Sequence, residues 1–283
     1  MNYSHLYHAG NFADVIKHIV LLALIKSLLR KTNGFFYLDT HAGAGFYDLF
    51  SVEAKKNKEY ESGILKCLNK KNPPELVKLY LACIKRINNR LSQSSIASLQ
   101  YYPGSPLIAH YFLREQDRMI LTEIHPQEYQ LLKKHFSNDS LASIHLMDGY
   151  QGLKAFLPPK ERRGLILIDP PFERPNEFTT ILSMLPIALK RFSTGIMAIW
   201  YPIKDRPPIE RFHRQLKKSI QQPILTIELS IYPENSPLHL NGCGMAVINS
   251  PWQFEEEMRS VLPFLKETLS LHQDGQCRIG MLK

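Results

Sequence analysis

The residues best suited to chemistry are Asp169, Pro170, Pro171 and Phe172, which directly follow a short apolar run, rich in isoleucine and leucine, at residues 164–168. Such a run is typical of a strand buried on both faces of a parallel sheet. The prolines end it, because they lack the N–H needed to continue a ladder. We expect Asp169 at the carboxyl edge of the sheet, where open α/β folds bind ligands. There the carboxylate and the Pro170 carbonyl can each accept an N–H, and Phe172 offers a stacking face.

An isolated Asp-Pro at a strand end is explained by an ordinary Asx turn, but the full string Asp-Pro-Pro-Phe is more specific. It resembles the (Asp/Asn/Ser)-Pro-Pro-aromatic motif of S-adenosylmethionine-dependent methyltransferases that modify exocyclic amino nitrogens. An amino nitrogen on an aromatic ring is a poor nucleophile, because its lone pair is delocalised. Two acceptors on its hydrogens draw it towards tetrahedral geometry and direct the lone pair at a methyl donor. The motif predicts catalytic roles for Asp169, Pro170 and Phe172.

Three earlier predicted strands also end in an acid, at Asp39, Glu123 and Asp148. Four successive strands that end this way are hard to explain by turn chemistry alone. The first strand leads into a loop with Gly43 and Gly45, whose lack of side chains lets a ligand approach the backbone closely. A dinucleotide fingerprint would require a third glycine at the position of Asp48, so the spacing disfavours NAD and fits the first motif of class I methyltransferases better.

The predicted fold is α/β, with five parallel strands and a terminal hairpin in a Rossmann-like seven-stranded sheet. Residues 51–99 interrupt the alternation of strands and helices, and we expect a two-helix insertion there. Residues at helical spacing predict its second helix: Leu76, Leu79, Tyr80, Cys83, Ile84, Ile87 and Leu91. The predicted domains are a methyltransferase-type domain of residues 1–50 and 100–283, with an N-terminal lid, and an inserted basic helical subdomain of residues 51–99.

The 283-residue chain carries a formal net charge of +9, and 44% of its residues are hydrophobic. The composition predicts a folded protein with a polyanionic partner. Residues 51–99 contain ten Lys or Arg against four Glu, which suits either a solvated helical face or a surface that tracks phosphates. The four cysteines lack metal-ligand spacing, so we expect reduced thiols, no metal and a cytoplasmic location. The longest unbroken apolar run, at residues 19–25, is too short for a membrane span.

The N-terminal region combines a polar, aromatic tail with an apolar helix. Asn11 is the expected cap of the helix, with Asp14 completing a capping box. Lys17 and His18 interrupt its apolar surface. A histidine in this setting is most often a hydrogen-bonded core residue, but an adjacent lysine is rarely buried without a partner. The residues before the cap have the composition of a frayed end.

With these residues in view, the chain resembles the RlmJ family of 23S ribosomal RNA adenine-N6 methyltransferases over nearly its whole length. The most specific blocks are residues 8–18, 37–45, 101–109, 113–117 and 162–171. The resemblance implies a class I methyltransferase domain with an inserted helical subdomain. It also implies a cofactor site for S-adenosylmethionine at His18, His41, Ser105, Glu123, Asp148, Gly149 and Asp169, with Lys17 beside them. Tyr3 matches a position implicated in RNA contact, so the resemblance implies a lid rather than a frayed tail.

One departure from the family pattern is Phe172, because adenine-N6 enzymes often have tyrosine there. Stacking survives this change, and any hydroxyl hydrogen bond is lost. The resemblance implies 23S ribosomal RNA as the substrate. We expect direct methyl transfer by a monomer, because the sulfonium of the cofactor is already a strong electrophile and needs neither a metal nor a covalent intermediate. The motif alone leaves a guanine-N2 or a DNA adenine methyltransferase open, and a non-catalytic RNA-binding module on the same fold is a further alternative.

Overall fold

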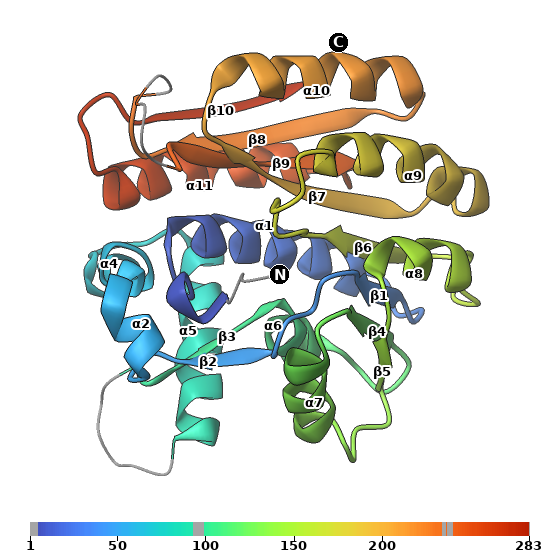
Figure 1. Ribbon diagram of the computed structural model, residues 1–283, viewed down its shortest axis with the longest axis horizontal. Coiled ribbons are helices and arrows are strands. Elements are labelled where there is room, and N and C mark those ends of the chain that lie inside the picture. The colour runs from blue at the N-terminus through green and yellow to red at the C-terminus, as the bar shows by residue number, and fades with distance from the viewer. Residues whose placement is uncertain (1–4, 93–98, 234–235, 237–239, 283) are drawn as a thin grey trace.

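The computed structural model describes residues 5–92, 99–233, 236 and 240–282. Its centre is an eight-stranded sheet in the order β10-β8-β9-β7-β6-β1-β4-β5, with helices on both faces (Figure 1). The strands of this sheet are β1 (Phe36–Asp39), β4 (Arg118–Glu123), β5 (Ala142–Leu146), β6 (Gly164–Ile168), β7 (Ile196–Ile203), β8 (Ile224–Ser230), β9 (Gly242–Ile248) and β10 (Gln276–Met281). A separate two-stranded sheet pairs β2 (Phe46–Asp48) with β3 (Tyr101–Pro103).

The helices alternate with the strands after the insertion, as the sequence pattern predicts. A short 3-10 helix, η1 (His5–Tyr7), precedes α1 (Phe12–Leu29). The others are α2 (Val52–Asn57), α3 (Glu59–Ser62), α4 (Ile64–Asn69), α5 (Glu75–Leu91), α6 (Ser105–Phe112), α7 (Pro126–His135), α8 (Gly149–Ala155), α9 (Glu177–Arg191), α10 (Arg206–Ser219) and α11 (Phe254–Leu269). Within the described residues, none of these helices has the length and apolar character to cross a membrane.

The sheet begins as predicted, with five parallel strands in the order β5-β4-β1-β6-β7. The expected hairpin also forms, and β9 lies between β7 and β8, antiparallel to both. The prediction of seven strands was wrong by one, because β10 pairs antiparallel with β8 at the sheet edge. Strand β10 is only partly buried and lacks an apolar run, so its sequence carries little strand signal.

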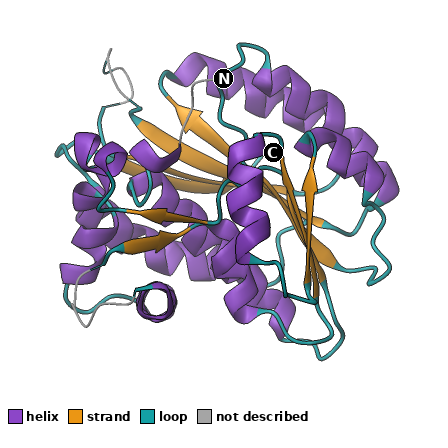
Figure 2. Ribbon diagram, turned by 60° about the horizontal axis from the view of Figure 1, so that its bottom comes forward, coloured by secondary structure: helices purple, strands orange, loops and turns teal. Residues whose placement is uncertain are grey.

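Helices cover both faces of the sheet (Figure 2), and an apolar core lies on each face. Alternation along β1 directs Tyr37 to the core that contains α1, α6 and α11. Phe36 and Leu38 point to the other core, which contains α8, α9 and α10. Both faces of the central strands are therefore covered, which explains why these strands are apolar at every position.

The N-terminus of α1 is capped in the predicted way. The side chain of Asn11 accepts a hydrogen bond from the Asp14 N–H at 3.0 Å. The Asp14 carboxylate in turn accepts from the Gly10 N–H at 2.9 Å. Nearly every residue of α1 is buried, and this includes Lys17 and His18. The helix is thus a central part of the core, and its two polar residues need partners inside the protein.

The inserted segment differs in part from the prediction. Helix α5 covers the expected periodic residues, and its apolar side joins the core of α1. The single helix expected before it is instead three short ones, α2, α3 and α4, which meet at Lys58 and Gly63. In Figure 1 they lie with α5 and the two-stranded sheet at one side of the molecule. The division into a main domain and a subdomain of residues 51–99 stays a prediction.

Candidate active site

A cavity of about 440 Å³ opens at the carboxyl edge of the parallel strands, beside the first turns of α1. All but one of the predicted site residues line it, from six different parts of the chain: Lys17, His18, His41, Ser105, Glu123, Asp148, Gly149, Asp169, Pro170 and Phe172. The fold therefore brings these positions together around one space. The remaining predicted residue, Tyr3, lies outside the described residues.

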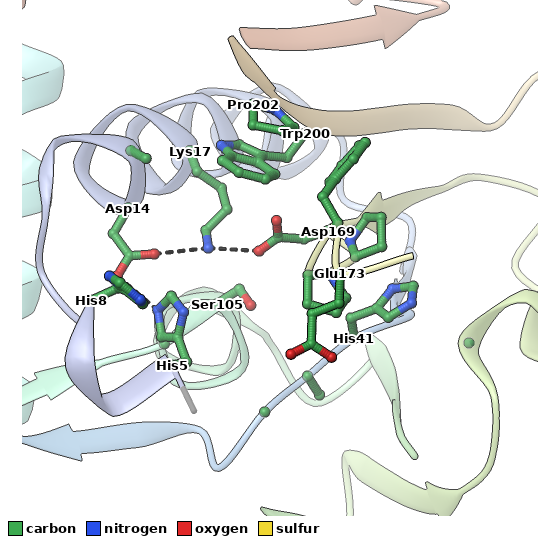
Figure 3. A pocket seen from close by; sticks show the side chains of 18 of the residues that line it. His5, His8, Asp14, Lys17, His41, Ser105, Asp169, Glu173, Trp200 and Pro202 are labelled. Carbon is green, nitrogen blue, oxygen red and sulfur yellow. Dashed lines mark hydrogen bonds and ion pairs between the residues drawn. The ribbon is translucent and has the colours of Figure 1, made fainter. Parts of the chain in front are cut away.

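Asp169 follows β6 and forms an ion pair with α1. Its Oδ2 atom lies 2.6 Å from Nζ of Lys17, which lies 2.8 Å from Oδ1 of Asp14 (Figure 3). The side chains of Asp14 and Lys17 are 2% and 7% exposed, whereas that of Asp169 is 16% exposed. Lys17 thus bridges two carboxylates, and the outer one faces the cavity.

The charges of Asp14, Lys17 and Asp169 stabilise one another. Burial opposes the charge on Lys17, but the two carboxylates outweigh burial and raise the pKa of Lys17 well above its ordinary value. Burial likewise opposes the charge on Asp14, yet His5 and Lys17 hold the pKa of its carboxyl well below its usual range. Asp14 also accepts from His5 Nε2 at 2.9 Å. A single buried carboxylate therefore fixes both Lys17 and the N-terminal 3-10 helix.

Asp39 lies behind the cavity wall rather than in it. Its Oδ2 accepts hydrogen bonds from Ser105 Oγ at 2.6 Å and from the Tyr37 hydroxyl at 2.8 Å, and its Oδ1 accepts from the His41 N–H at 3.3 Å. Burial raises its pKa to about 6, although these hydrogen bonds oppose the rise. Asp39 thus fixes Ser105 at the start of α6 and His41 in the loop after β1, and both of these side chains reach the cavity.

Glu123 and Asp148, at the ends of the next two strands, are held by backbone N–H groups. Glu123 accepts from Gly43 at 2.8 Å and from His125 at 2.7 Å. Asp148 caps α8 by accepting from Tyr150 at 2.7 Å. Each carboxylate therefore has a fixed orientation at the cavity wall, which is the preorganisation that recognition of a polar ligand requires.

Two histidines at the cavity are kept neutral by burial. The pKa of His18 is lowered to about 3 and that of His41 to about 4, and desolvation is the main cause in both cases. His18 Nδ1 lies 2.8 Å from the hydroxyl of Tyr102. Its Nε2 is buried and has no hydrogen-bond partner within the described part of the chain. A cavity ligand with a polar group could satisfy that atom.

Glycines provide backbone surface at the same wall. Gly43 has a φ of +60°, and a Cβ there would lie 2.4 Å from the hydroxyl of Tyr47. A Cβ on Gly149 would lie 2.0 Å from the carbonyl oxygen of Thr40. At Gly149 a side chain would collide with the backbone, and at Gly43 the left-handed φ would strain any other residue, so both positions favour glycine.

Phe172 has a left-handed backbone with a φ of 51°, which is uncommon for a bulky residue. Its ring packs against Phe178 at 4.9 Å and Trp200 at 5.8 Å, both between centroids. Neighbouring aromatic rings thus hold Phe172 in this conformation at the cavity edge. Backbone strain at this position is consistent with a functional constraint on where the ring is placed.

Several cavity residues were not found from the sequence. Asp14 was predicted only as part of a helix cap, and Trp200 carries no signal because it looks like any apolar strand residue. Tyr150 and Glu177 also line the cavity, where the tyrosine hydroxyl donates to the glutamate at 2.6 Å. Tyr150 and Glu177 belong to no sequence motif, so only the fold reveals that they form a pair.

The strand order, with β9 inserted antiparallel next to β7, and the row of acids at the carboxyl edge define a class I methyltransferase fold. The family model described as "Ribosomal RNA large subunit methyltransferase D, RlmJ" matches residues 32–281. The chain belongs to this family.

Relatives of known name agree with this assignment. The chain is 45% identical over its whole length to Ribosomal RNA large subunit methyltransferase J of Escherichia coli K12, of which it covers 99%. It is 44% identical to the protein of the same name from Haemophilus influenzae, over 95% of this chain and 94% of that one. A crystal structure of a Legionella pneumophila protein is similar, with a TM-score of 0.87 and 38% identity over 96% of this chain and 98% of the other.

Proposed function

We propose that this protein transfers a methyl group from S-adenosylmethionine to the exocyclic N6 of an adenine in 23S ribosomal RNA. The observation that carries the proposal is the position of Asp169. Its carboxylate follows β6 at the edge of a cavity, is fixed by Lys17, and shares that cavity with every other described residue that the family resemblance assigns to the cofactor. The family names of the two curated relatives support ribosomal RNA as the substrate.

The residues around the cavity suit S-adenosylmethionine. A volume of about 440 Å³ lies in the range of small-molecule sites. Glu123, at the end of the second strand of the parallel series, suits the ribose hydroxyls, and Asp148 with the Gly149 N–H suits the adenine edge. Nε2 of His18, which has no partner among the described residues, offers the cofactor a further polar contact. When bound, this cofactor supplies an electrophilic methyl group on a sulfonium.

The protein's own residues then position the nucleophile. The carboxylate of Asp169 and the carbonyl of Pro170 accept the two hydrogens of the amino group, which concentrates its lone pair on nitrogen. Lys17 donates to one carboxylate oxygen and so holds Asp169 in one orientation, with Oδ1 left for the substrate. Phe172 holds the base by stacking. Asp169 or solvent takes up the proton that the nitrogen loses after transfer.

The test uses Asp169→Ala and Asp169→Asn with 23S RNA from cells that lack this protein. We expect the rate of methyl transfer at saturating S-adenosylmethionine to fall by about 10²–10³-fold in both, because asparagine has the shape but not the charge of aspartate. Mass spectrometry of the nucleosides identifies the product. The proposal fails if either variant keeps full activity, or if the wild-type product is N2-methylguanosine or arises only on DNA.

A matched control separates the loss of Asp169 from general damage. Asp274 is an exposed aspartate in the turn before β10, with 60% of its side chain accessible. We expect Asp274→Ala to keep wild-type activity. Circular dichroism and calorimetric titration with S-adenosylmethionine then show whether the Asp169 variants retain their fold and still bind the cofactor, as the proposal requires.

A further inference from the structure

A ridge beside the cavity mouth consists of η1, Phe50 and α2, and the two helices pack against each other. His5 and His8 of the N-terminal segment line the cavity, and Tyr7 lies between them in the sequence. On the other side, Tyr47 of β2 lines the cavity, and the chain continues from there to Phe50 and α2. The ridge is therefore connected to the cavity through two separate segments, which the ribbon shows side by side (Figure 1).

The ridge carries two aromatic rings, each with a lysine over it. Nζ of Lys55 lies 5.4 Å from the centroid of Phe50, and Nζ of Lys56 lies 6.0 Å from the centroid of Tyr7. Phe50 is 42% exposed, so part of its ring is accessible to a ligand. Proteins bind single-stranded nucleic acid with aromatic rings, on which the bases stack, and with cationic side chains, which bind the phosphates. The ridge has both.

The two lysines share their helix with one acidic residue, Glu53. Of the glutamates near α2, Glu59 accepts from His8 and Asn11, and Glu61 lies 3.7 Å from Lys58. No acidic side chain forms an ion pair with Lys55 or Lys56 within the described residues. These two lysines are therefore available to a polyanion.

The ridge is also rigid. The Phe50 N–H donates to Asp48 Oδ1 at 2.8 Å, and Ser51 caps α2 by accepting from Ala54 at 3.1 Å. The Gly10 carbonyl accepts from the Ile64 N–H at 2.8 Å, and a Cβ on Gly63 would lie 2.1 Å from that same carbonyl oxygen. The insertion thus docks tightly on the N-terminal segment. A rigid surface loses little conformational entropy when it binds a ligand.

We propose that this ridge binds unpaired nucleotides adjacent to the target adenine. Their bases stack on Phe50 and Tyr7, and their phosphates lie near Lys55 and Lys56. This inference rests on the proposed function and adds a requirement: the RNA next to the modified base must be single-stranded. A paired flank presents its bases only to each other, so a stacking surface on the enzyme would then have nothing to bind.

The test compares a fluorescently labelled single-stranded ten-nucleotide RNA with the same RNA annealed to its complement, by fluorescence anisotropy. We expect the wild type to prefer the single strand, and Phe50→Ala to weaken single-strand binding about tenfold. In the double variant Lys55→Ala/Lys56→Ala, the slope of log K against log salt should become smaller by about 1.4. A change in salt slope reports lost phosphate contacts, which mere destabilisation of the fold would not produce.

Two control variants remove an exposed aromatic ring and a pair of neighbouring lysines at places away from the ridge. Trp252 is 78% exposed with Arg30 over its ring at 5.9 Å, at the opposite end of β9 from the cavity. Lys217 and Lys218 are exposed neighbours on α10. Trp252→Ala and Lys217→Ala/Lys218→Ala should bind RNA like the wild type. Equal binding of duplex and single strand, or equal effects of ridge and control variants, overturns the ridge proposal.

Failure of the ridge and failure of the proposed function give different results. Methyl transfer to 23S RNA from cells lacking this protein is measured with the same variants. If the wild type methylates adenine and Phe50→Ala keeps the wild-type KM for RNA, only the ridge proposal is wrong. If the wild type transfers no methyl group to adenine of that RNA while single-strand binding still depends on Phe50, the proposed function is wrong and the ridge stands as a binding surface.

Discussion

Two buried clusters of charged residues lie on opposite faces of the sheet. On the α1 face, Lys17 bridges Asp14 and Asp169. On the α10 face, Glu228 accepts from Arg206 at 2.5 Å and from the hydroxyl of Tyr201 at 3.0 Å. Both clusters contain a carboxylate paired with a cation, and both are largely removed from water.

The clusters differ in what their carboxylates face. Both oxygens of Glu228 are used by partners inside the protein, and the residue is 3% exposed. Asp169 uses only Oδ2 for Lys17, and it lines the cavity. Two successive residues of β7 lie on opposite faces of the sheet. Trp200 lines the cavity, and the hydroxyl of Tyr201 donates to Glu228. A buried ion pair is therefore no sign of a catalytic site unless one partner retains an acceptor at a cavity.

The strongest test of this contrast is Lys17→Met. The change leaves two carboxylates close together without their cation, and Asp169 loses its fixed orientation. We expect methyl transfer to fall by about 100-fold or more, since misplacement of a reacting group by 1 Å has that effect. We also expect a loss of stability of about 3–5 kcal/mol, as for other broken buried pairs.

The measurements for Lys17→Met are single-turnover methylation and urea unfolding. Lys26 is the control, because it lies on the same helix and pairs with Glu257 at the surface, with 43% of its side chain exposed. Lys26→Met should lose little of either quantity. Unchanged activity in Lys17→Met would show that Asp169 needs no cation, and the distinction between the clusters would then be lost.

A smaller effect is expected for Asp14→Asn, which changes the carboxylate that pairs with Lys17 on the side away from the cavity. Asparagine can still accept from the Gly10 N–H, but it removes one of the two charges that hold Lys17. We expect the transfer rate to fall about tenfold, with the fold retained, because Lys17 keeps Asp169 as its partner. Steady-state kinetics provide the measurement, and a wild-type rate would assign Asp14 to the helix cap alone.

The matching change in the other cluster is Glu228→Gln. It replaces a charged acceptor of Arg206 with a neutral one, and a hydrogen bond to a charged group contributes about 1.5–3 kcal/mol. We expect a stability loss of about this size in urea unfolding and a wild-type methylation rate. A large loss of activity without loss of stability would place this cluster in the catalytic machinery and contradict the comparison.

The sequence predicted those parts of the site that depend on chain-local patterns. The carboxylates at Asp39, Glu123 and Asp169 follow apolar runs, and a parallel sheet places all such ends at one edge. Strand β10 was missed, because an exposed edge strand needs backbone pairing more than apolar residues. The three short helices before α5 were missed because their ends depend on docking to Gly10, which no periodicity reveals.

The part of the site that could not be predicted depends on contacts distant in sequence. Lys17 and Asp169 are 152 residues apart, and only the packing of α1 against the sheet joins them. Asp14 satisfied a local cap pattern, which concealed its second role beside Lys17. Residues with two roles are identified only when the fold shows both partners.

The smallest expected effect concerns pH, and it distinguishes histidines at the cavity from those at the surface. The pKa of His18 is lowered to about 3 and that of His41 to about 4 by burial, against an ordinary value of 6.5. As the pH falls below 6.5, the unfolded chain binds two protons that the folded protein does not, which lowers stability. Asp39 acts oppositely, because burial raises its pKa to about 6 and the folded protein binds one proton more between pH 6 and 4.

The net difference between these three groups is about one proton, so together they contribute a slope of about 1.4 kcal/mol per pH unit from pH 6 to 5. His18→Gln removes one of the two opposing histidines and should reduce the slope in this window by about 1.4 kcal/mol per pH unit, because one proton fewer distinguishes the unfolded from the folded chain. The control is His272→Gln, which removes an exposed histidine outside the cavity. Urea unfolding at steps of 0.25 pH unit measures both variants. If His18→Gln keeps the wild-type slope, His18 is charged in the folded protein and the cavity is more polar than its burial indicates.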